Sequence, residues 1–139
     1  MRLNQETDYA LRLVYIFTCK KSDEYLSAKE IAFQHAIPFR FLLKVMIKLK
    51  KAGIIASRQG IDGGYKLAKK PRDINLKDVI EAIEGPININ RCLKSSALCN
   101  AGLAPLCKVH RTLAQVQSNL LRDLESHNFE SIEGWLPFT

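Results

Sequence analysis

The sequence predicts a mainly α-helical protein that carries one small β-hairpin and a long helix near its C-terminal end. Three observations support this fold class. Apolar residues recur every three or four positions in several segments, which is the helical period. Two short runs that read as strands flank a glycine-rich segment at residues 59–64, which is typical of a hairpin. An amphipathic segment over residues 109–126 is longer than the other helical patterns.

Capping residues mark the first two predicted helices. Thr7 is a preferred N-cap residue, and it precedes a helix that runs to about residue 19. Ser27 and Glu30 stand three positions apart in a capping-box pattern, which begins a second, short helix. The helical spacing assigns the following residues to the buried face of the first helix: Leu11, Val14, Tyr15 and Thr18.

A third helix and a hairpin complete the predicted head. Pro38 lies where the first turn of this helix begins, and Gly53 follows its end as a C′ glycine would. A tight turn at residues 33–37 joins the second and third helices, so the pair forms a helix-turn-helix pattern. Two strands at residues 54–58 and 65–68 follow. The order of helix, turn, helix and hairpin predicts a winged helix-turn-helix.

The remaining chain divides into a short helix, a loop and the long helix. Residues 76–84 carry an apolar stripe at helical spacing and stop at Gly85. Residues 88–107 show no clean periodicity and are predicted to be a loop. The apolar positions of the last helix are Val109, Leu113, Val116, Leu120 and Leu124. This stripe favours a dimer contact, with packing onto its own domain as the alternative. The predicted units are a winged helix-turn-helix over 1–85, a cysteine-bearing loop over 86–108, and a dimerisation helix with a tail over 109–139.

Charge narrows the class of partner. The chain has 21 Lys and Arg against 14 Asp and Glu, a formal net charge of +7. Such a balance favours a polyanion, either nucleic acid or an anionic membrane surface. No apolar run approaches the ~18 residues of a membrane span, and no targeting segment is recognisable. We therefore expect a cytoplasmic protein without a membrane partner, in which clustered cysteines bind a metal more often than they form disulfides.

The third helix carries the strongest nucleic-acid signal. Its cations fall on one side of the helix, opposite its apolar residues, at positions Arg40, Lys44, Lys48 and Lys51. Side chains at this spacing reach phosphates along a major groove. Leu43 and Ile47 border this face and can touch thymine methyl groups. The alternative is an ordinary solvated helix surface, which the preceding turn and the following hairpin disfavour.

The hairpin offers a second contact. Arg58 precedes its turn, and an arginine at such a place can enter a narrow minor groove. The glycines of the turn have a local explanation, because a tight hairpin demands positive φ. Gly63 and Gly64 are not a phosphate-binding loop, because no strand-loop-helix with a following Lys and Ser or Thr surrounds them.

The cysteine-bearing loop is a candidate metal site. Cys92, Cys99 and Cys107 are separated by six and seven residues, and His110 follows the third cysteine. This spacing is too wide for the paired cysteines of a zinc ribbon. Thiolates hold either zinc or an iron–sulfur cluster, and three cysteines suit a cluster with a different fourth ligand. Zinc binding and free thiols remain open alternatives.

The chain resembles the Rrf2 family of bacterial transcription regulators over nearly its whole length. The motifs that carry this resemblance are specific in their order and spacing, although each is weak alone. They are M-R-L at residues 1–3, T-D-Y-A-L at 7–11, S-A-K-E-I-A at 27–32, F-L-L-K at 41–44, L-K-K-A-G at 49–53, S-R at 57–58, G-G-Y-K-L-A at 63–68, I-N-L-K-D-V-I-E-A-I-E-G at 74–85, and the three-cysteine loop.

This resemblance implies a homodimer that binds a palindromic operator in double-stranded DNA. The third helix would read the major groove and the wing the minor groove, and the expected contacts are Ser27, Arg40, Leu43, Lys44, Lys48, Arg58, Gly63 and Tyr65. A long C-terminal helix would form the dimer. Repression is the commoner outcome in such families, so we expect a repressor that has no small-molecule substrate.

The resemblance also implies a [2Fe–2S] or [4Fe–4S] cluster on Cys92, Cys99 and Cys107, with zinc as the alternative. The fourth ligand would be His110, or Asp8 from the partner subunit. Redox state, cluster loss or nitric oxide would then change DNA affinity. The gaps between the cysteines are slightly wider than in well-known cluster-binding members, which leaves the cluster type open. A regulator with structural zinc or no metal is the alternative function.

Other function classes fit the residues less well. The sequence shows no nucleophile with a base, no paired carboxylates in a pocket-forming context and no nucleotide-binding loop, so an enzyme is not expected. A winged helix that binds protein or RNA would lack operator-specific protection of duplex DNA. A redox carrier would leave the basic third helix unexplained.

Overall fold

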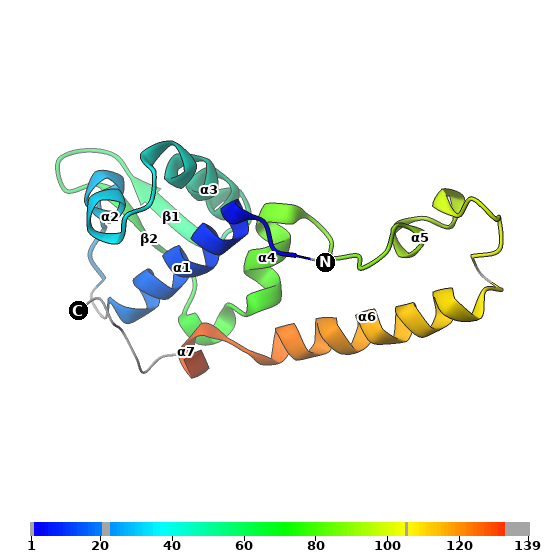
Figure 1. Ribbon diagram of the computed structural model, residues 1–139. Coiled ribbons are helices and arrows are strands. Elements are labelled where there is room, and N and C mark those ends of the chain that lie inside the picture. Colours follow the sequence, from blue (N-terminus) through cyan, green and yellow to red (C-terminus); the bar gives the residue numbers. More distant parts are fainter. Residues whose placement is uncertain (1, 21–22, 105, 133–139) are drawn as a thin grey trace.

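The chain forms a rounded head and a long helical arm (Figure 1). The computed structural model describes residues 2–20, 23–104 and 106–132, so residues 133–139 of the tail predicted after the last helix lie outside the described residues. In chain order the elements are α1 (Gln5–Cys19), α2 (Ala28–His35), α3 (Phe39–Lys51), β1 (Ile55–Arg58), β2 (Gly64–Leu67), the 3-10 helix η1 (Pro71–Asp73), α4 (Leu76–Glu84), α5 (Arg91–Lys94), the 3-10 helix η2 (Ser96–Leu98), α6 (Lys108–Ser126) and α7 (Phe129–Ile132). This order confirms the predicted mainly α fold with a small hairpin wing.

The start of α1 differs from the prediction. Asn4, not Thr7, is the N-cap, and its Oδ1 accepts hydrogen bonds from the Thr7 backbone N–H (2.8 Å) and hydroxyl (2.9 Å). Thr7 is fully buried inside the first turn. Asn and Thr are both good caps, and only the burial of Thr7 shows which one acts. The Asn4 backbone N–H also donates to Glu84 Oε1 (3.0 Å), which ties the start of α1 to the end of α4.

The helix-turn-helix is tighter than its sequence predicts. Ser27 is the N-cap residue of α2, but its side chain makes no capping hydrogen bond to the described residues, so the capping box is absent there. The box forms instead at α4, between Asn75 and Asp78. α2 continues to His35, and Ala36 (φ 52°) alone supplies the left-handed residue that turns the chain. The predicted turn at 33–37 was therefore too long.

The wing is a two-stranded antiparallel hairpin in the register Ile55 to Leu67 and Arg58 to Gly64. Its base is joined to the segment before α2, because Leu26 and Tyr65 exchange backbone hydrogen bonds of 2.8 Å. Gly64 has φ +145°, and a Cβ there would lie 2.3 Å from the Leu26 carbonyl oxygen. Gly63 is needed for close approach and not for positive φ, since a Cβ would lie 2.2 Å from the Arg58 carbonyl oxygen.

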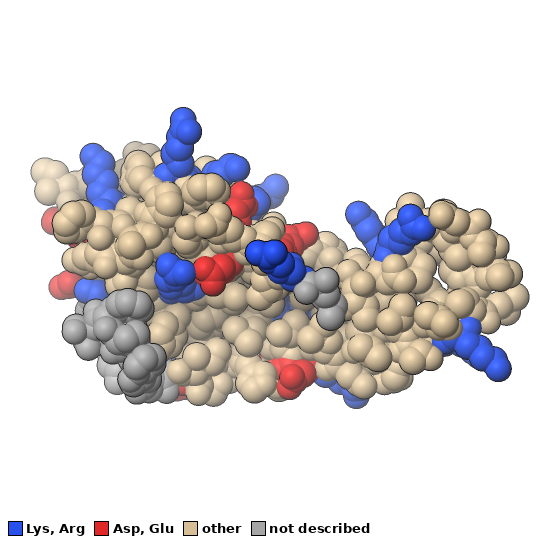
Figure 2. All heavy atoms as spheres, viewed as in Figure 1, with Lys and Arg blue, Asp and Glu red and all other residues tan. Residues whose placement is uncertain are grey.

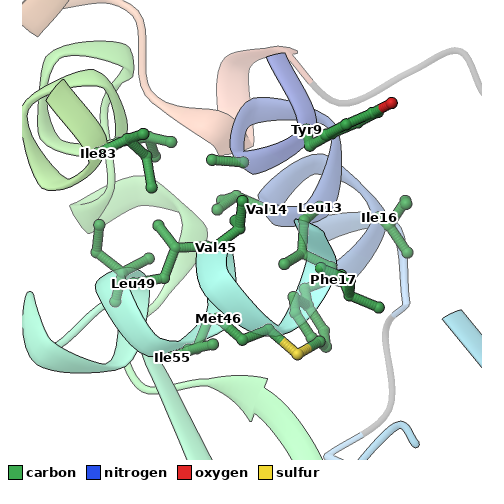
Figure 3. Packing of buried hydrophobic residues seen from close by; sticks show 14 of the residues in the cluster. Tyr9, Leu13, Val14, Ile16, Phe17, Val45, Met46, Leu49, Ile55 and Ile83 are labelled. Carbon is green, nitrogen blue, oxygen red and sulfur yellow. The ribbon is translucent and has the colours of Figure 1, made fainter. Parts of the chain in front are cut away.

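The core of the head lies between α1, α3, α4 and the start of the hairpin (Figure 3). Leu13 and Val14 from α1 and Leu49 from α3 are completely buried there. The buried face of α1 is broader than predicted: Leu11 and Tyr15 are only partly buried, whereas Leu13 and Phe17 are buried. All three apolar residues predicted to form the stripe of α4 (Val79, Ile80 and Ile83) are buried.

The arm consists of α6 with α5 beside its far end (Figure 1). None of the 19 residues of α6, all of which are described, is buried. Val109 and Val116 of its apolar stripe are 65% and 47% exposed. Two contacts anchor the near part of α6 to α4 and to the chain that follows α4: Lys77 Nζ lies 3.0 Å from Glu125 Oε1, and the Ile89 N–H donates to Gln117 Oε1 at 2.8 Å. The predicted loop at 88–107 contains α5 and η2, which its mixed composition did not reveal.

Candidate nucleic-acid interface and cysteine pocket

The outer face of α3 is basic and apolar at once. Leu42, Val45 and Leu49 are buried toward the core. At ~100° per residue the opposite side therefore carries Arg40 and Ile47, and both are exposed, Ile47 to 68%. Space-filling spheres show Lys and Arg side chains projecting from the edge of the head that carries α2, α3 and the hairpin (Figure 2). This face presents cations together with an apolar side chain to any partner that lies along α3.

The four cations predicted to form the basic face of α3 fall into two pairs. Lys44 and Lys48 both turn toward α1, where Lys44 Nζ lies 3.4 Å from Glu6 Oε1 and Lys48 Nζ lies 2.7 Å from Glu6 Oε2. The hydrogen bond from Lys48 is the largest cause that lowers the pKa of Glu6, with Lys44 adding to it against the opposing effect of burial. Among the described residues, Arg40 and Lys51 form no ion pair. The predicted basic face is thus half neutralised.

The wing arginine is held by an aromatic ring. The Arg58 guanidinium lies 4.3 Å from the ring centroid of Tyr25, and Lys66 Nζ lies 4.9 Å from the same centroid. Arg58 also donates to the Asp62 carbonyl oxygen at 2.8 Å across the wing turn. Ile61, at the tip of that turn, is fully exposed. Arg58 therefore has a defined position beside the turn, and the tip itself is apolar.

The remaining predicted DNA contacts gather around the base of the wing. Ser27, Arg58 and Gly63 line one hollow between the wing and α2. Tyr65 lies beside them, and its backbone is paired with Leu26. Leu43 is partly buried on α3. The fold thus joins Ser27, Arg58, Gly63 and Tyr65 in one region, with the α3 residues in the adjoining helix.

The three loop cysteines and His110 line a single pocket at the far end of the arm. Cys92, Cys99 and Cys107 are free thiols and each is partly buried. His110 Nδ1 lies 3.3 Å from Cys92 Sγ. Asp8 is not among the residues that line this pocket; it lies on α1 in the head and pairs with Arg12 at 2.9 Å. Within one chain, the structure therefore places His110 with the cysteines and Asp8 apart from them.

Backbone N–H groups surround Cys99. Hydrogen bonds from the N–H groups of Leu103 and Ala101 are the largest causes that lower the pKa of the Cys99 thiol, and Gly102 and Ala104 contribute further ones. Such a concave arrangement of N–H groups favours a negative charge. Cys107 is the N-cap residue of α6. The N–H groups around Cys99 therefore favour the thiolate form of that residue.

The described residues contain no group of three or more Cys, His, Asp or Glu side chains placed to hold a metal ion. The pocket brings the donors to one place without closing them around a centre. Its donor set, three thiols and one imidazole, is the set that soft metals and iron–sulfur clusters accept. The residues present therefore fit a cluster in kind.

Two residues near the interface were missed by the sequence analysis. Glu6 was given no role, yet it forms ion pairs with both Lys44 and Lys48 of α3. Tyr25 was also given no role, yet it is partly buried under Arg58 and Lys66. No local pattern signals either role, because each depends on elements far away in the sequence.

No described helix is long and apolar enough to cross a membrane.

Comparisons with known proteins agree with this architecture. A family model described as "Rrf2: Iron-dependent Transcriptional regulator" matches residues 3–133. The chain is 31% identical over 132 residues to the HTH-type transcriptional regulator NsrR of Bacillus licheniformis, covering 95% of this chain and 92% of that protein. Its fold is similar to that of IscR from T. potens, with a TM-score of 0.69 at 22% identity, covering 95% of this chain and 85% of that one. CymR (YrzC), the global cysteine regulator of B. subtilis, gives a TM-score of 0.67 at 22% identity and 95% coverage of both chains.

Proposed function

This chain belongs to the Rrf2 family of transcription regulators, and on that premise we propose that it is a homodimeric, operator-binding repressor that senses its signal through an iron–sulfur cluster. It is a regulator and not an enzyme. The observation that carries the cluster proposal is the gathering of Cys92, Cys99, Cys107 and His110 around one pocket. The sensed signal is redox state, cluster supply or nitric oxide, as the resemblance implies.

DNA recognition in this proposal uses both parts of the head. Arg40, Leu43, Lys44 and Lys48 lie along the major groove, with Ile47 placed to touch thymine methyl groups. Ser27, Arg58, Gly63 and Tyr65 bring the wing to the adjacent minor groove. The support is that Arg40 is exposed and forms no ion pair with the described residues, and that Ser27, Arg58, Gly63 and Tyr65 gather at the wing base.

Dimerisation in this proposal uses the arm. The 19-residue helix α6 has no fully buried residue, and Val109 and Val116 of its apolar stripe are exposed to water, a surface that a second copy of the helix would cover. Two heads on one palindrome must stand one or more helical turns of DNA apart. Any change in how the two arms cross therefore changes how well the two heads fit the two half-sites of the DNA.

The cluster in this proposal is held by Cys92, Cys99, Cys107 and His110, with Asp8 of the partner subunit as the alternative fourth ligand. A cluster there supplies a centre that responds to oxidants and nitric oxide. Gln117, about two turns along α6 from His110, accepts the Ile89 N–H, and Glu125, near the end of α6 away from the pocket, pairs with Lys77 of α4. These contacts give a continuous route from the pocket wall through α6 to α4, which packs on α1 and α3.

The cluster proposal is tested by metal analysis of the protein purified without oxygen. We expect iron and acid-labile sulfide in near-equal amounts, with visible absorption bands that a Cys92→Ala variant loses. Cys19→Ala is the matched control, because Cys19 lies on α1 outside the pocket, and it should keep the colour. Zinc alone would make the pocket structural, and no metal even after reconstitution would refute the sensor.

The DNA proposal is tested separately by selection of duplex fragments and footprinting. We expect a palindromic site. We expect Arg40→Ala to bind DNA more weakly because it loses about one phosphate contact, which makes the slope of log affinity against log salt concentration shallower by ~0.9. Arg72→Ala removes the same charge from η1, which packs against α7, and serves as the control. Equal affinity of the two variants would contradict a role for α3.

A further inference from the structure

Glu6 is the acidic residue that the basic face of α3 meets inside the chain. Its two carboxylate oxygens are divided between two lysines, Oε1 to Lys44 and Oε2 to Lys48. The Glu6 side chain is only 18% exposed, whereas the lysines are 65% and 41% exposed. The pair therefore lies at the edge of the proposed DNA surface and is not hidden in the core.

The position of Glu6 is fixed by its surroundings. The Asn4 cap holds the first turn of α1, through the Thr7 backbone N–H and hydroxyl, and Glu84 of α4 accepts the Asn4 N–H. Glu6 therefore cannot move away from α3 without disturbing the packing of α1 on α4. A phosphate that approaches Lys44 or Lys48 meets a carboxylate that stays in place.

We propose that Glu6 acts as an internal competitor for DNA phosphate: it holds Lys44 and Lys48 in the free protein and thereby restrains binding to duplex DNA of arbitrary sequence. This inference rests on the proposed use of α3 in DNA binding. Arg40 and Lys51, which form no ion pair among the described residues, remain the unrestrained phosphate contacts of the same helix.

The physical basis is that non-specific affinity is almost wholly electrostatic. Each phosphate neutralised adds about 0.9 to the slope of log affinity against log salt concentration. A lysine that is already paired with a carboxylate neutralises a phosphate only in part, because the negative carboxylate repels the negative phosphate. At an operator, base contacts add affinity that does not depend on these lysines, whereas at other sequences phosphate contacts supply nearly all of the affinity. Glu6 thus lowers the affinity that phosphate contacts alone can provide.

The test is the affinity of the full chain for a mixed-sequence duplex of about 25 base pairs, a length near that of a natural site, measured by fluorescence anisotropy over a series of salt concentrations. We expect Glu6→Gln to bind about threefold to tenfold tighter than wild type, with a salt slope steeper by up to about one. Glu6→Asp keeps the net charge but shortens the reach to Lys48, and it should give a smaller increase of the same sign.

Two further variants separate local from global charge. Asp123→Asn makes the same charge change on α6, where Asp123 pairs only with His127 among the described residues, and it should change affinity less than twofold. In a Lys44→Gln, Lys48→Gln background, Glu6→Gln should have no further effect. An equal gain in Glu6→Gln and Asp123→Asn would overturn the competitor role, as would weaker binding by Glu6→Gln.

The same measurements distinguish this inference from the proposed function. If wild type binds duplex DNA and the double lysine variant binds it more weakly, α3 contacts DNA whatever Glu6 does. If the wild type shows no salt-dependent binding to duplex DNA, the proposed DNA-binding function fails first, and the role of Glu6 fails with it. If α3 binds DNA and Glu6→Gln matches wild type, only the competitor role is refuted.

Discussion

The head and the arm of this protein are stabilised in opposite ways. In the head, side chains from α1, α3 and α4 fill one apolar core, and residues such as Leu13 and Leu49 have no exposed surface at all (Figure 3). In the arm, the longest helix has no fully buried residue, and large apolar residues such as Val109 remain in contact with water. The head therefore packs its apolar residues within one chain, whereas the arm leaves several of its own exposed.

This difference indicates where each part obtains its stability. Burying a Leu or Val side chain stabilises a fold by ~1.5–3 kcal/mol, and the head gains this many times over. A helix in water gains little from its own hydrogen bonds, because most helical stability comes from packing of its apolar face. α6 therefore depends on what covers it, for which we propose a second copy of the chain, and on the cluster that we propose at its tip.

The largest expected effect is on the core of the head. Leu49→Ala removes a side chain with no exposed surface, and we expect the free energy of unfolding to fall by about 2–5 kcal/mol. Val116→Ala deletes a smaller, half-exposed group on α6 and should cost less than ~1 kcal/mol in the unfolding of the head. Urea denaturation followed by circular dichroism compares the two variants. Equal losses would show that head and arm unfold as one unit.

The second expected effect is on self-association. Val116→Glu places a charge on the exposed apolar stripe of α6, and we expect the dimer to dissociate at least about tenfold more readily, which corresponds to ~1.4 kcal/mol. Ser118→Glu puts the same charge about 200° round the helix and is the control. Sedimentation equilibrium gives both dissociation constants. If the Val116→Glu variant still forms a stable dimer, the dimer interface does not include this face of α6.

A smaller effect is expected at the wing. Tyr25→Leu removes the ring that Arg58 and Lys66 cover, at a cost of about 1 kcal/mol in local stability. Hydrogen exchange of the wing amides should become several-fold faster, and DNA affinity should fall with it. Tyr25→Phe keeps the ring and should behave as wild type. If Phe and Leu variants exchange alike, the hydroxyl group and not the ring face holds the wing.

The smallest effect is expected at the contact between head and arm. The hydrogen bond to Glu125 raises the pKa of Lys77 above its ordinary value of 10.5, with Glu81 adding to this against the effect of burial. A raised folded pKa means that folding favours the protonated lysine. Its contribution is therefore complete below about pH 10 and is lost as pH rises through the folded pKa. For this partly exposed pair we expect no more than ~0.5 kcal/mol.

Thermal unfolding of wild type and Lys77→Gln at several pH values measures this contribution. The difference in Tm should be constant from pH 6 to pH 9 and should shrink above pH 10.5. Lys94→Gln is the control, since Lys94 lies on α5 and forms no ion pair with the described residues. A difference that grows at high pH would mean that the lysine is stabilised in its neutral form.

Periodic and capping signals determined most of the fold. The stripe of Val79, Ile80 and Ile83 placed α4 correctly, and the glycines at 60–64 placed the wing within one residue at each strand. Prediction was weaker where two residues offered the same local chemistry. Asn4 and Thr7 can both cap a helix, and only the burial of Thr7 decides between them. Ser27 has a capping-box sequence whose hydrogen bonds do not form.

The cysteine site was likewise predictable from the sequence only in part. Three thiols and an imidazole were recognisable from the sequence as a possible metal-binding set, and the resemblance to the Rrf2 family implied that they bind an iron–sulfur cluster. Their convergence on one pocket depends on α5 turning back beside α6, which no spacing of cysteines specifies. The N–H groups around Cys99 likewise arise from a short turn without a periodic signal.

The sequence by itself determined where the five longest helices form (α1, α2, α3, α4 and α6) and that α3 is basic, because these properties depend on neighbours within about one helical turn. The tertiary structure alone decided that Lys44 and Lys48 meet Glu6, that Arg58 lies over the ring of Tyr25, and that no residue of α6 is fully buried. Each of these depends on segments 30 or more residues apart, or on the absence of a covering element. Charge and hydrophobicity along the chain cannot specify such pairings, since many partners of equal local character compete for each one.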